Sequence, residues 1–156
     1  MTALERAISY LSVKPRTRSQ VAAYLKDKGF SEDETADTIA RLEEYRYIDD
    51  MEYARMYTES GFAKGHGESR IRRELADKGV DSNTVDDVFY EFENEGMIPN
   101  QFQMALEVGR SVLGDLKLND MEYEERRKME GRIGRRLISR GFETSVVYSV
   151  IRELEE

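Results

Sequence analysis

The sequence predicts an all-α protein built as an elongated array of three tandem three-helix modules. Only two prolines occur in 156 residues, and long stretches are dominated by Glu, Arg, Lys, Ala and Leu, which lose little side-chain freedom in a helix. One helical pattern is also written three times along the chain, as in repeat proteins. Hydrophobic residues make up 39% and charged residues 36%, so we expect a thin core, which suits small modules packed edge to edge.

The repeated pattern is a basic helix followed by a glycine stop. It aligns without a gap over residues 18–30, 68–80 and 130–142. Each copy has two apolar residues four positions apart, which share one helix face, and a glycine that fits the left-handed residue after a helix end. In chain order these residues are Val21, Leu25 and Gly29; Ile71, Leu75 and Gly79; and Ile133, Leu137 and Gly141.

The pattern extends in both directions and sets the expected module boundaries. An amphipathic stretch precedes each basic helix, and apolar residues keep one register after each glycine, which predicts a third helix. We therefore expect modules at residues 1–48, 49–98 and 99–156. The glycines are 50 and then 62 positions apart, so the third module carries an insertion near residues 114–125, either a loop or a longer helix.

Composition narrows the location and the partners of the chain. It has no cysteine and no apolar run long enough to span a membrane, so we expect a cytoplasmic protein without disulfides, thiolate metal sites or membrane contact. The net charge is −8, and residues 49–98 carry 6 basic against 13 acidic residues. That acidity argues against wrapping of bare nucleic acid through bulk attraction.

Residues 47–80 read YIDDMEYARMYTESGFAKGHGESRIRRELADKGV. An acidic turn leads into a helix that starts aromatic-Ala-x-x-aromatic, followed by a loop with glycine and lysine and then the basic helix. This order resembles the central module of the RecX family of bacterial recombination regulators. The flanking repeats resemble that family's other three-helix units, so the resemblance covers nearly the whole chain.

The resemblance implies a monomeric protein without enzymatic activity and without a cofactor. It implies binding to the RecA nucleoprotein filament, in the filament's helical groove, and modulation, usually inhibition, of its ATP hydrolysis, strand exchange and SOS-inducing activity. Weak direct contact with single-stranded DNA is a further implication, which the acidity of the middle module puts in question.

The candidate partner-binding residues are basic residues beside the apolar stripes, which are the repeated pairs of apolar residues four positions apart. Arg70 aligns with Arg132, and Arg73 aligns with Arg135; residues three apart project from one side of a helix. We expect them on solvated faces, where guanidinium groups suit carboxylate or phosphate contacts. The alternative is a solvated face offset by neighbouring glutamates. The full candidate set is Arg70, Arg72, Arg73, Lys78, Arg132, Arg135, Arg136 and Arg140.

Other residue types point to structure rather than chemistry. We expect Tyr45, Tyr47, Tyr53 and Tyr57 to pack between modules instead of stacking on bases. The single histidine, His66, lacks the partners of a metal site or a catalytic triad. Adjacent aspartates suit helix capping, and we identify no catalytic, cofactor-binding or metal-binding residue.

Two other functions remain open at this stage. Residues 17–48 resemble a helix-turn-helix unit, which would make the chain a DNA-binding transcriptional regulator. The second helix of that unit, however, starts SEDETADT, and its acidic residues would repel phosphate. The third possibility is a generic helical-repeat scaffold that binds proteins without affecting a recombinase.

Overall fold

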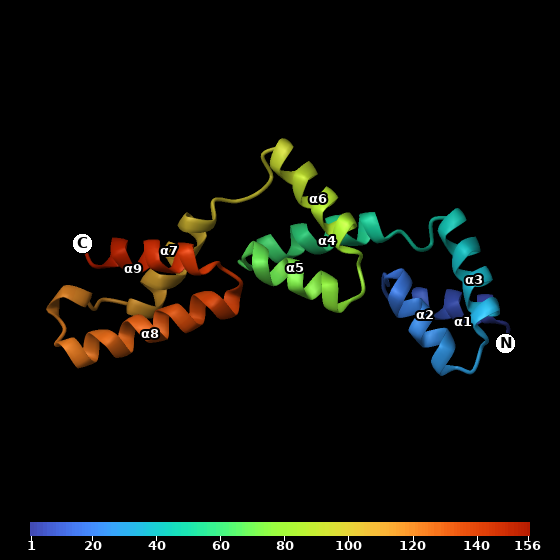
Figure 1. Cartoon of the computed structure of the whole chain (residues 1–156), viewed down its shortest axis with the longest axis horizontal. Helices are drawn as coiled ribbons and strands as arrows, with labels where there is room; N and C mark the ends of the chain where they lie inside the picture. Colours follow the sequence, from blue (N-terminus) through green and yellow to red (C-terminus); the bar gives the residue numbers. More distant parts are fainter. The chain divides into compact units, whose positions relative to one another are not determined.

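The computed structural model describes all 156 residues, and it contains nine α-helices, one short 3-10 helix and no strand (Figure 1). The predicted all-α class is therefore confirmed. The helices are α1 (Ala3–Leu11), α2 (Arg18–Asp27), α3 (Glu32–Glu44), α4 (Asp50–Ala63), α5 (Glu68–Asp77), α6 (Ser82–Asn94), α7 (Gln101–Leu113), η1 (Leu118–Asp120), α8 (Tyr123–Arg140) and α9 (Thr144–Leu154).

The three basic helices α2, α5 and α8 end in the same way. Gly29, Gly79 and Gly141 adopt φ values of 91°, 84° and 100°, in the left-handed region that glycine tolerates best. The residue after each glycine donates its backbone N–H to the carbonyl of the leucine that lies four positions before the glycine. At the end of α8 this bond runs from Phe142 to Leu137 at 3.1 Å. This bond pattern satisfies carbonyls at the helix end and stops the helix.

Side-chain caps fix where the helices of the first module begin. Thr17 and Gln20 form a reciprocal capping box at the start of α2, and Ser31 and Glu34 form another at the start of α3. Each box satisfies two backbone N–H groups that the first helical turn leaves without partners. The acidic residues of the 31–38 segment lie in the first turn of α3, where negative charge stabilises a helix.

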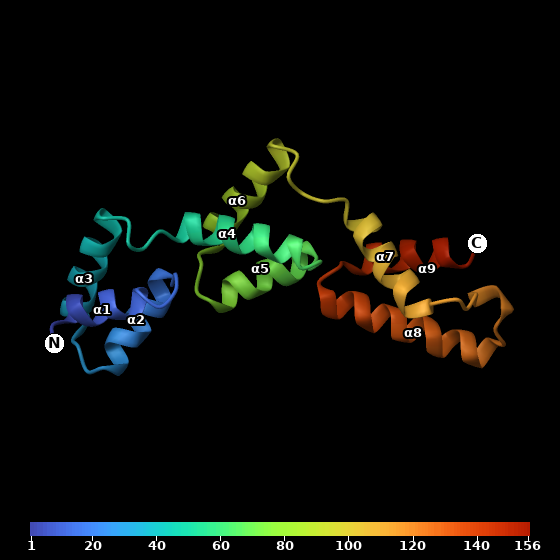
Figure 2. The ribbon, with the colours of Figure 1, turned by 180° about the vertical axis from the view of Figure 1, so that it is seen from behind.

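Contacts divide the chain into two compact units. Unit 1 comprises Met1–Thr58 with Glu74–Phe92, and unit 2 comprises Glu59–Arg73 with Glu93–Glu156. In unit 1, α1, α2 and α3 pack against one another; in unit 2, α7, α8 and α9 do the same, which both views of the ribbon show (Figure 1 and Figure 2).

The apolar stripes form the cores of these bundles. Val21 and Leu25 are completely buried with Ala7, Ile39 and Leu42 in unit 1. The unit 2 cluster contains Ala105, Leu106, Ile133, Leu137, Phe142, Val147 and Val150. Burial of each large apolar side chain contributes about 1.5–3 kcal/mol, so the residues that the repeat shares are the ones that hold each bundle together.

The segment around residues 114–125 is part turn and part helix. η1 places Leu118 in a fully buried position, packed toward α8. α8 itself begins at Tyr123 and runs for 18 residues, against 10 in α2 and α5. The side-chain amide of Asn119 donates to the carbonyl of Glu155, so the segment also covers the end of α9.

The tyrosine prediction is wrong at two of its four positions. Tyr45 is 68% exposed and Tyr47 is 60% exposed, because they follow the end of α3, where Arg46 turns the chain with φ 59°. Tyr53 and Tyr57 are half-buried on α4 and lie nearly parallel, with ring centroids 6.1 Å apart.

Candidate partner-binding site

Inside each unit, the glycine turn of one basic helix packs on the first turn of another. In unit 1 the Thr17 hydroxyl donates to the Lys78 carbonyl at 2.7 Å, and Gly79 lies against Ser19. In unit 2 the Gly67 N–H donates to the Arg140 carbonyl at 2.8 Å. We call these contacts the unit 1 junction and the unit 2 junction.

The unit 2 junction is a contact of backbone with backbone. The Ser69 N–H donates to the Gly141 carbonyl at 3.1 Å. A side-chain carbon placed on Gly141 would lie 2.6 Å from the Arg70 nitrogen, and one placed on Gly67 would lie 2.6 Å from the Gly141 carbonyl carbon. Glycine is therefore required at both positions by close approach. At Gly29, by contrast, an added carbon would meet no atom within 4 Å.

Two of the predicted partner-binding residues belong to this junction. Arg70 is half-buried against the end of α8, and its guanidinium donates to the Ser139 carbonyl at 3.4 Å. Arg140 is also half-buried, and its carbonyl accepts the bond from Gly67. The expectation that Arg70 occupies a solvated face is wrong, because the α8 end covers that side of α5.

Arg72 and Lys78 are likewise engaged within the chain. The Nε of Arg72 donates to Glu68 one turn earlier on α5, at 3.0 Å. The Nζ of Lys78 lies 5.4 Å from the ring centroid of Tyr57, within cation–π range, and Lys78 is half-buried. Both cationic side chains therefore already have a partner within the chain, which is the Glu68 carboxylate for Arg72 and the Tyr57 ring for Lys78.

The remaining four predicted residues are exposed, and no carboxylate forms an ion pair with them. They form the exposed arginine set, which lies entirely in unit 2. α5 supplies one member and α8 supplies three, within a single turn and a half of helix. The members are Arg73, Arg132, Arg135 and Arg136.

The α8 arginines border a shallow groove on α7. Arg136 and Arg140, one turn apart, line a hollow of about 180 Å³ with Val108, Ser111 and Val112. Glu107 also lines this hollow. The α7 wall could not be found from the sequence, since nothing in the repeat pattern says which face of α7 meets α8.

One further cation of α8, Arg126, is neutralised and does not belong to the set. Arg126 pairs with Glu155 at 3.0 Å and with Glu130 at 3.2 Å. The hydrogen bond that Arg126 donates to Glu155, and then the one that it donates to Glu130, raises the pKa of Arg126; the bond to Arg126 lowers the pKa of the Glu155 carboxyl. This network ties the start of α8 to the end of the chain.

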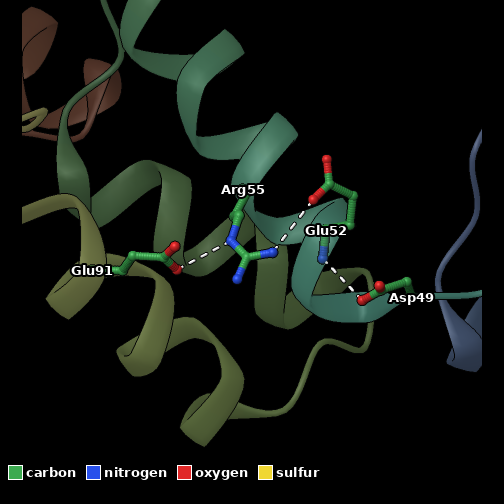
Figure 3. Close-up of polar contacts among 4 residues, drawn as sticks. All are labelled: Asp49, Glu52, Arg55 and Glu91. Carbon is green, nitrogen blue, oxygen red and sulfur yellow. Dashed lines mark hydrogen bonds and ion pairs between the residues drawn. The ribbon is translucent and has the colours of Figure 1, made fainter. Parts of the chain in front are cut away.

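Much of the acidity of the middle module is used in the same way. Figure 3 shows Arg55 of α4 held between Glu91 of α6, at 3.1 Å, and Glu52 of its own helix, at 3.3 Å. The hydrogen bond with Glu91 is the main cause of the raised pKa of Arg55. Asp49 caps α4 by accepting the Glu52 N–H, and Asp50 accepts the N–H of Arg18 at the start of α2.

No group of three or more His, Cys, Asp or Glu side chains is arranged to hold a metal ion. His66 follows the end of α4 and is half-buried. None of the helices combines the length and the apolar character needed to cross a membrane.

Comparison with known proteins identifies the two N-terminal modules. Sequence models of the RecX first and second three-helix domains match residues 3–42 and 49–88. The chain is 32% identical to the regulatory protein RecX of Bacillus cytotoxicus, over 97% of this chain and 53% of that protein. It is 29% identical to the regulatory protein RecX of Prosthecochloris aestuarii, over 97% and 93%.

The chain thus spans about half the length of several curated relatives that it matches. Among solved structures, RecX from Lactobacillus salivarius superimposes with a TM-score of 0.76 at 23% identity, covering 98% of this chain and 94% of that one. That likeness confirms the helical fold. The two matching domains, over residues 3–42 and 49–88, establish that this chain belongs to the RecX family.

Proposed function

We propose that this protein regulates the RecA recombinase by binding the filament that RecA forms on single-stranded DNA, and that its main effect is inhibition. Membership of the RecX family supports the proposal, as does the name "Regulatory protein RecX" carried by its relatives. The protein acts by contact, without catalysis or a cofactor.

The observation that supports particular residues as the binding site is the exposed arginine set. In a chain of net charge −8, acidic side chains neutralise Arg55, Arg72 and Arg126. No acidic side chain forms an ion pair with the exposed arginine set. An arginine fork pairs strongly with a carboxylate or phosphate, so these residues are available to a partner at no cost in broken internal bonds.

Sequence-specific binding to duplex DNA is less well supported. The first turn of α3 carries Glu32, Asp33 and Glu34, where a recognition helix would approach the DNA backbone. Negative charges there oppose phosphate. A generic scaffold would bind a protein but leave RecA activity unchanged, so activity measurements separate it from a regulator.

The test is binding to a preassembled RecA filament on single-stranded DNA, measured by co-sedimentation. We expect the unmodified protein to sediment with the filament. The double variant Arg132→Glu/Arg135→Glu should bind at least about tenfold more weakly, because it replaces two cations that attract the partner's anionic groups with two carboxylates that repel them. Its thermal stability should be nearly unchanged, since both residues are exposed.

The matched control is Arg110→Glu/Arg152→Glu. It makes the same change in charge at two exposed positions of unit 2, so it should bind like the unmodified protein. Equal weakening by both variants would show that binding follows net charge rather than the exposed arginine set. Absence of sedimentation by the unmodified, folded protein would overturn the proposed function itself.

A further inference from the structure

A second surface, in unit 1, places two tyrosines, an isoleucine and one arginine around a hollow. The hollow has a volume of about 230 Å³, several times the roughly 30 Å³ that one water occupies in the liquid. Its walls come from α1, from α3, which packs against α1, and from the turn that follows α3. The lining residues are Leu4, Ile8, Arg41, Leu42, Tyr45 and Tyr47. We call this feature the α1–α3 hollow.

The α1–α3 hollow has a buried floor and an exposed apolar rim. Leu42 is buried in the core of the α1–α3 bundle, and Leu4 packs against that core. On the rim, Ile8 is 44% exposed, and the two tyrosines are more exposed still. Apolar side chains that are exposed together commonly mark an interaction surface, and tyrosine is among the residues that contribute most to binding energy.

The backbone of the turn holds the two tyrosines in place. The Tyr45 N–H donates to the Arg41 carbonyl at 3.1 Å, and the Tyr47 N–H donates to the Leu42 carbonyl at 2.8 Å. Between the tyrosines, Arg46 adopts φ 59°, which residues other than glycine rarely do. The rim is therefore part of an ordered turn, so a ligand does not have to order it on binding.

The second module makes the same turn without this surface. Gly96 lies 50 positions after Arg46 and occupies the equivalent place. It has φ 67°, and its N–H donates to the carbonyl three positions earlier, as that of Arg46 does. Glu95 stands there in place of Tyr45. Because the turn forms without an aromatic side chain, local folding does not account for the tyrosines at the hollow.

Arg41 is the one charged residue that lines the hollow. It is exposed, and no carboxylate forms an ion pair with it. Glu43, two positions further on, pairs instead with Arg18 at 3.0 Å. A guanidinium beside an apolar hollow complements a ligand that carries a carboxylate next to a bulky apolar group. A purely apolar ligand would cover this cation without supplying a counter-charge.

Neighbouring acids limit how many carboxylates the ligand can carry. Glu5 and Glu44 are exposed and adjoin lining residues in the sequence, although neither lines the hollow itself. Their negative charges oppose a segment that is rich in acidic side chains. The last residue of a protein chain meets both requirements with a single charge, because its carboxylate and its side chain are attached to the same Cα atom.

We propose that the α1–α3 hollow binds the free C-terminus of a partner protein whose last residue is bulky and apolar. The terminal side chain packs on Ile8 and on the rings of Tyr45 and Tyr47. The terminal carboxylate pairs with Arg41. This surface lies in unit 1, whereas the exposed arginine set lies in unit 2, and it requires no recombinase. The inference therefore goes beyond the proposed function and holds or fails independently of it.

The experiment measures binding of the full chain, without RecA, to the fluorescein-labelled peptide Gly-Ser-Gly-Ser-Leu-Phe by fluorescence anisotropy. Parallel arms use the same peptide with a C-terminal amide and a free-acid peptide that ends in Ser-Ser. We expect the first peptide to bind at least about tenfold more tightly than either of the others. The amide offers no charge to Arg41, and the serine peptide offers no apolar group to the hollow.

Two variants separate the contacts. Arg41→Gln should weaken binding of the free acid by about tenfold and change binding of the amide by less than about twofold, because only the acid pairs with Arg41. Tyr45→Ala should weaken binding of both by about tenfold, because it removes an apolar wall. Its matched control is Tyr90→Ala, at a position 69% exposed on α6 in the same unit, which should change affinity by less than about twofold.

Four results would overturn the proposal. They are absence of free-acid binding at protein concentrations up to about 1 mM, equal affinity for the acid and the amide, equal effects of Tyr45→Ala and Tyr90→Ala with both variants folded, and occupation by a second copy. Sedimentation velocity of the unmodified chain reveals the last as a dimer that Tyr45→Ala dissociates. Arg132→Glu/Arg135→Glu should bind the peptide normally, so failure of this inference and failure of the proposed function remain distinguishable.

Discussion

Replacing Gly141 with alanine should destabilise the protein far more than the same change at Gly29, although both glycines end aligned helices. Both have positive φ, 100° and 91°, where an L-residue costs about 1–2 kcal/mol. At Gly29 that strain is the whole effect, since an added carbon meets nothing within 4 Å.

At Gly141 the added carbon meets the backbone of Arg70, 2.6 Å from its nitrogen, and backbone cannot move aside as a flexible side chain can. Overpacking of this kind costs about 1–3 kcal/mol. The shift also weakens the hydrogen bonds from Gly67 and Ser69, each worth about 1 kcal/mol. With the positive-φ strain included, the total is about 4–7 kcal/mol for Gly141→Ala if both bonds are lost, against about 1–2 kcal/mol for Gly29→Ala.

Urea unfolding followed by circular dichroism measures both losses. In a chain of this size each kcal/mol lowers Tm by about 2–4 °C, so the variants should also separate clearly in thermal melts. Gly79→Ala should fall between them, because its added carbon meets only the side chain of Ser19 closely. Equal losses at Gly29 and Gly141 would refute the reasoning, since they would mean that the unit 2 junction contributes nothing.

Three further outcomes are expected. Leu118→Ala should cost about 2–5 kcal/mol in urea unfolding, because this side chain of η1 is fully buried. Arg70→Glu should lower Tm, because Arg70 is half-buried at the unit 2 junction. Tm of the unmodified protein should fall as pH drops through the lowered pKa of Glu155, because protonation removes the pair with Arg126, and Arg126→Gln should flatten that part of the pH profile.

Each of these outcomes has a control and a contrary result. Leu116→Ala, at a position 54% exposed, should cost less than about 0.5 kcal/mol; similar losses at the two leucines would mean that η1 does not pack. Arg73→Glu should leave Tm unchanged, and a drop as large as that of Arg70→Glu would contradict the junction. For Glu155 the sign is fixed: a carboxyl with a lowered pKa stabilises above its ordinary pKa, so a Tm that rises on acidification opposes the account.

The local pattern of the sequence is enough to predict the basic helices and their stops. Val21 and Leu25 share a face because they are one turn apart, and a glycine after a basic residue is itself the stop signal. These features depend on neighbours within one or two helical turns. The fold class follows, because the same local signal occurs three times.

What could not be predicted depends on residues far apart in the chain. Gly141 reads as a helix stop, and its second role appears only when Arg70, 71 positions away, is packed against it. The same contact removes Arg70 from the solvated face that helical spacing assigned to it. Tyr45 and Tyr47 read as core residues, yet the chain turns at Arg46 and leaves them outside.

The exposed arginine set depends partly on local sequence, which can be predicted, and partly on contacts between distant residues, which cannot. Spacing pairs Arg132 with Arg135, and Arg136 lies within the same turn and a half of α8. Spacing alone cannot tell them from Arg126, which is equally basic and lies on the same helix. The difference arises from Glu155, at the far end of α9, which reaches Arg126 and neutralises it.

The most direct test of the central claim is ATP hydrolysis by RecA on single-stranded DNA, titrated with this protein at substoichiometric ratios. We predict that the steady-state rate falls as the protein is added. Arg132→Glu/Arg135→Glu should need a higher concentration for the same effect, and Arg110→Glu/Arg152→Glu should act like the unmodified chain. An unchanged rate at all ratios, with the protein folded, would contradict the account.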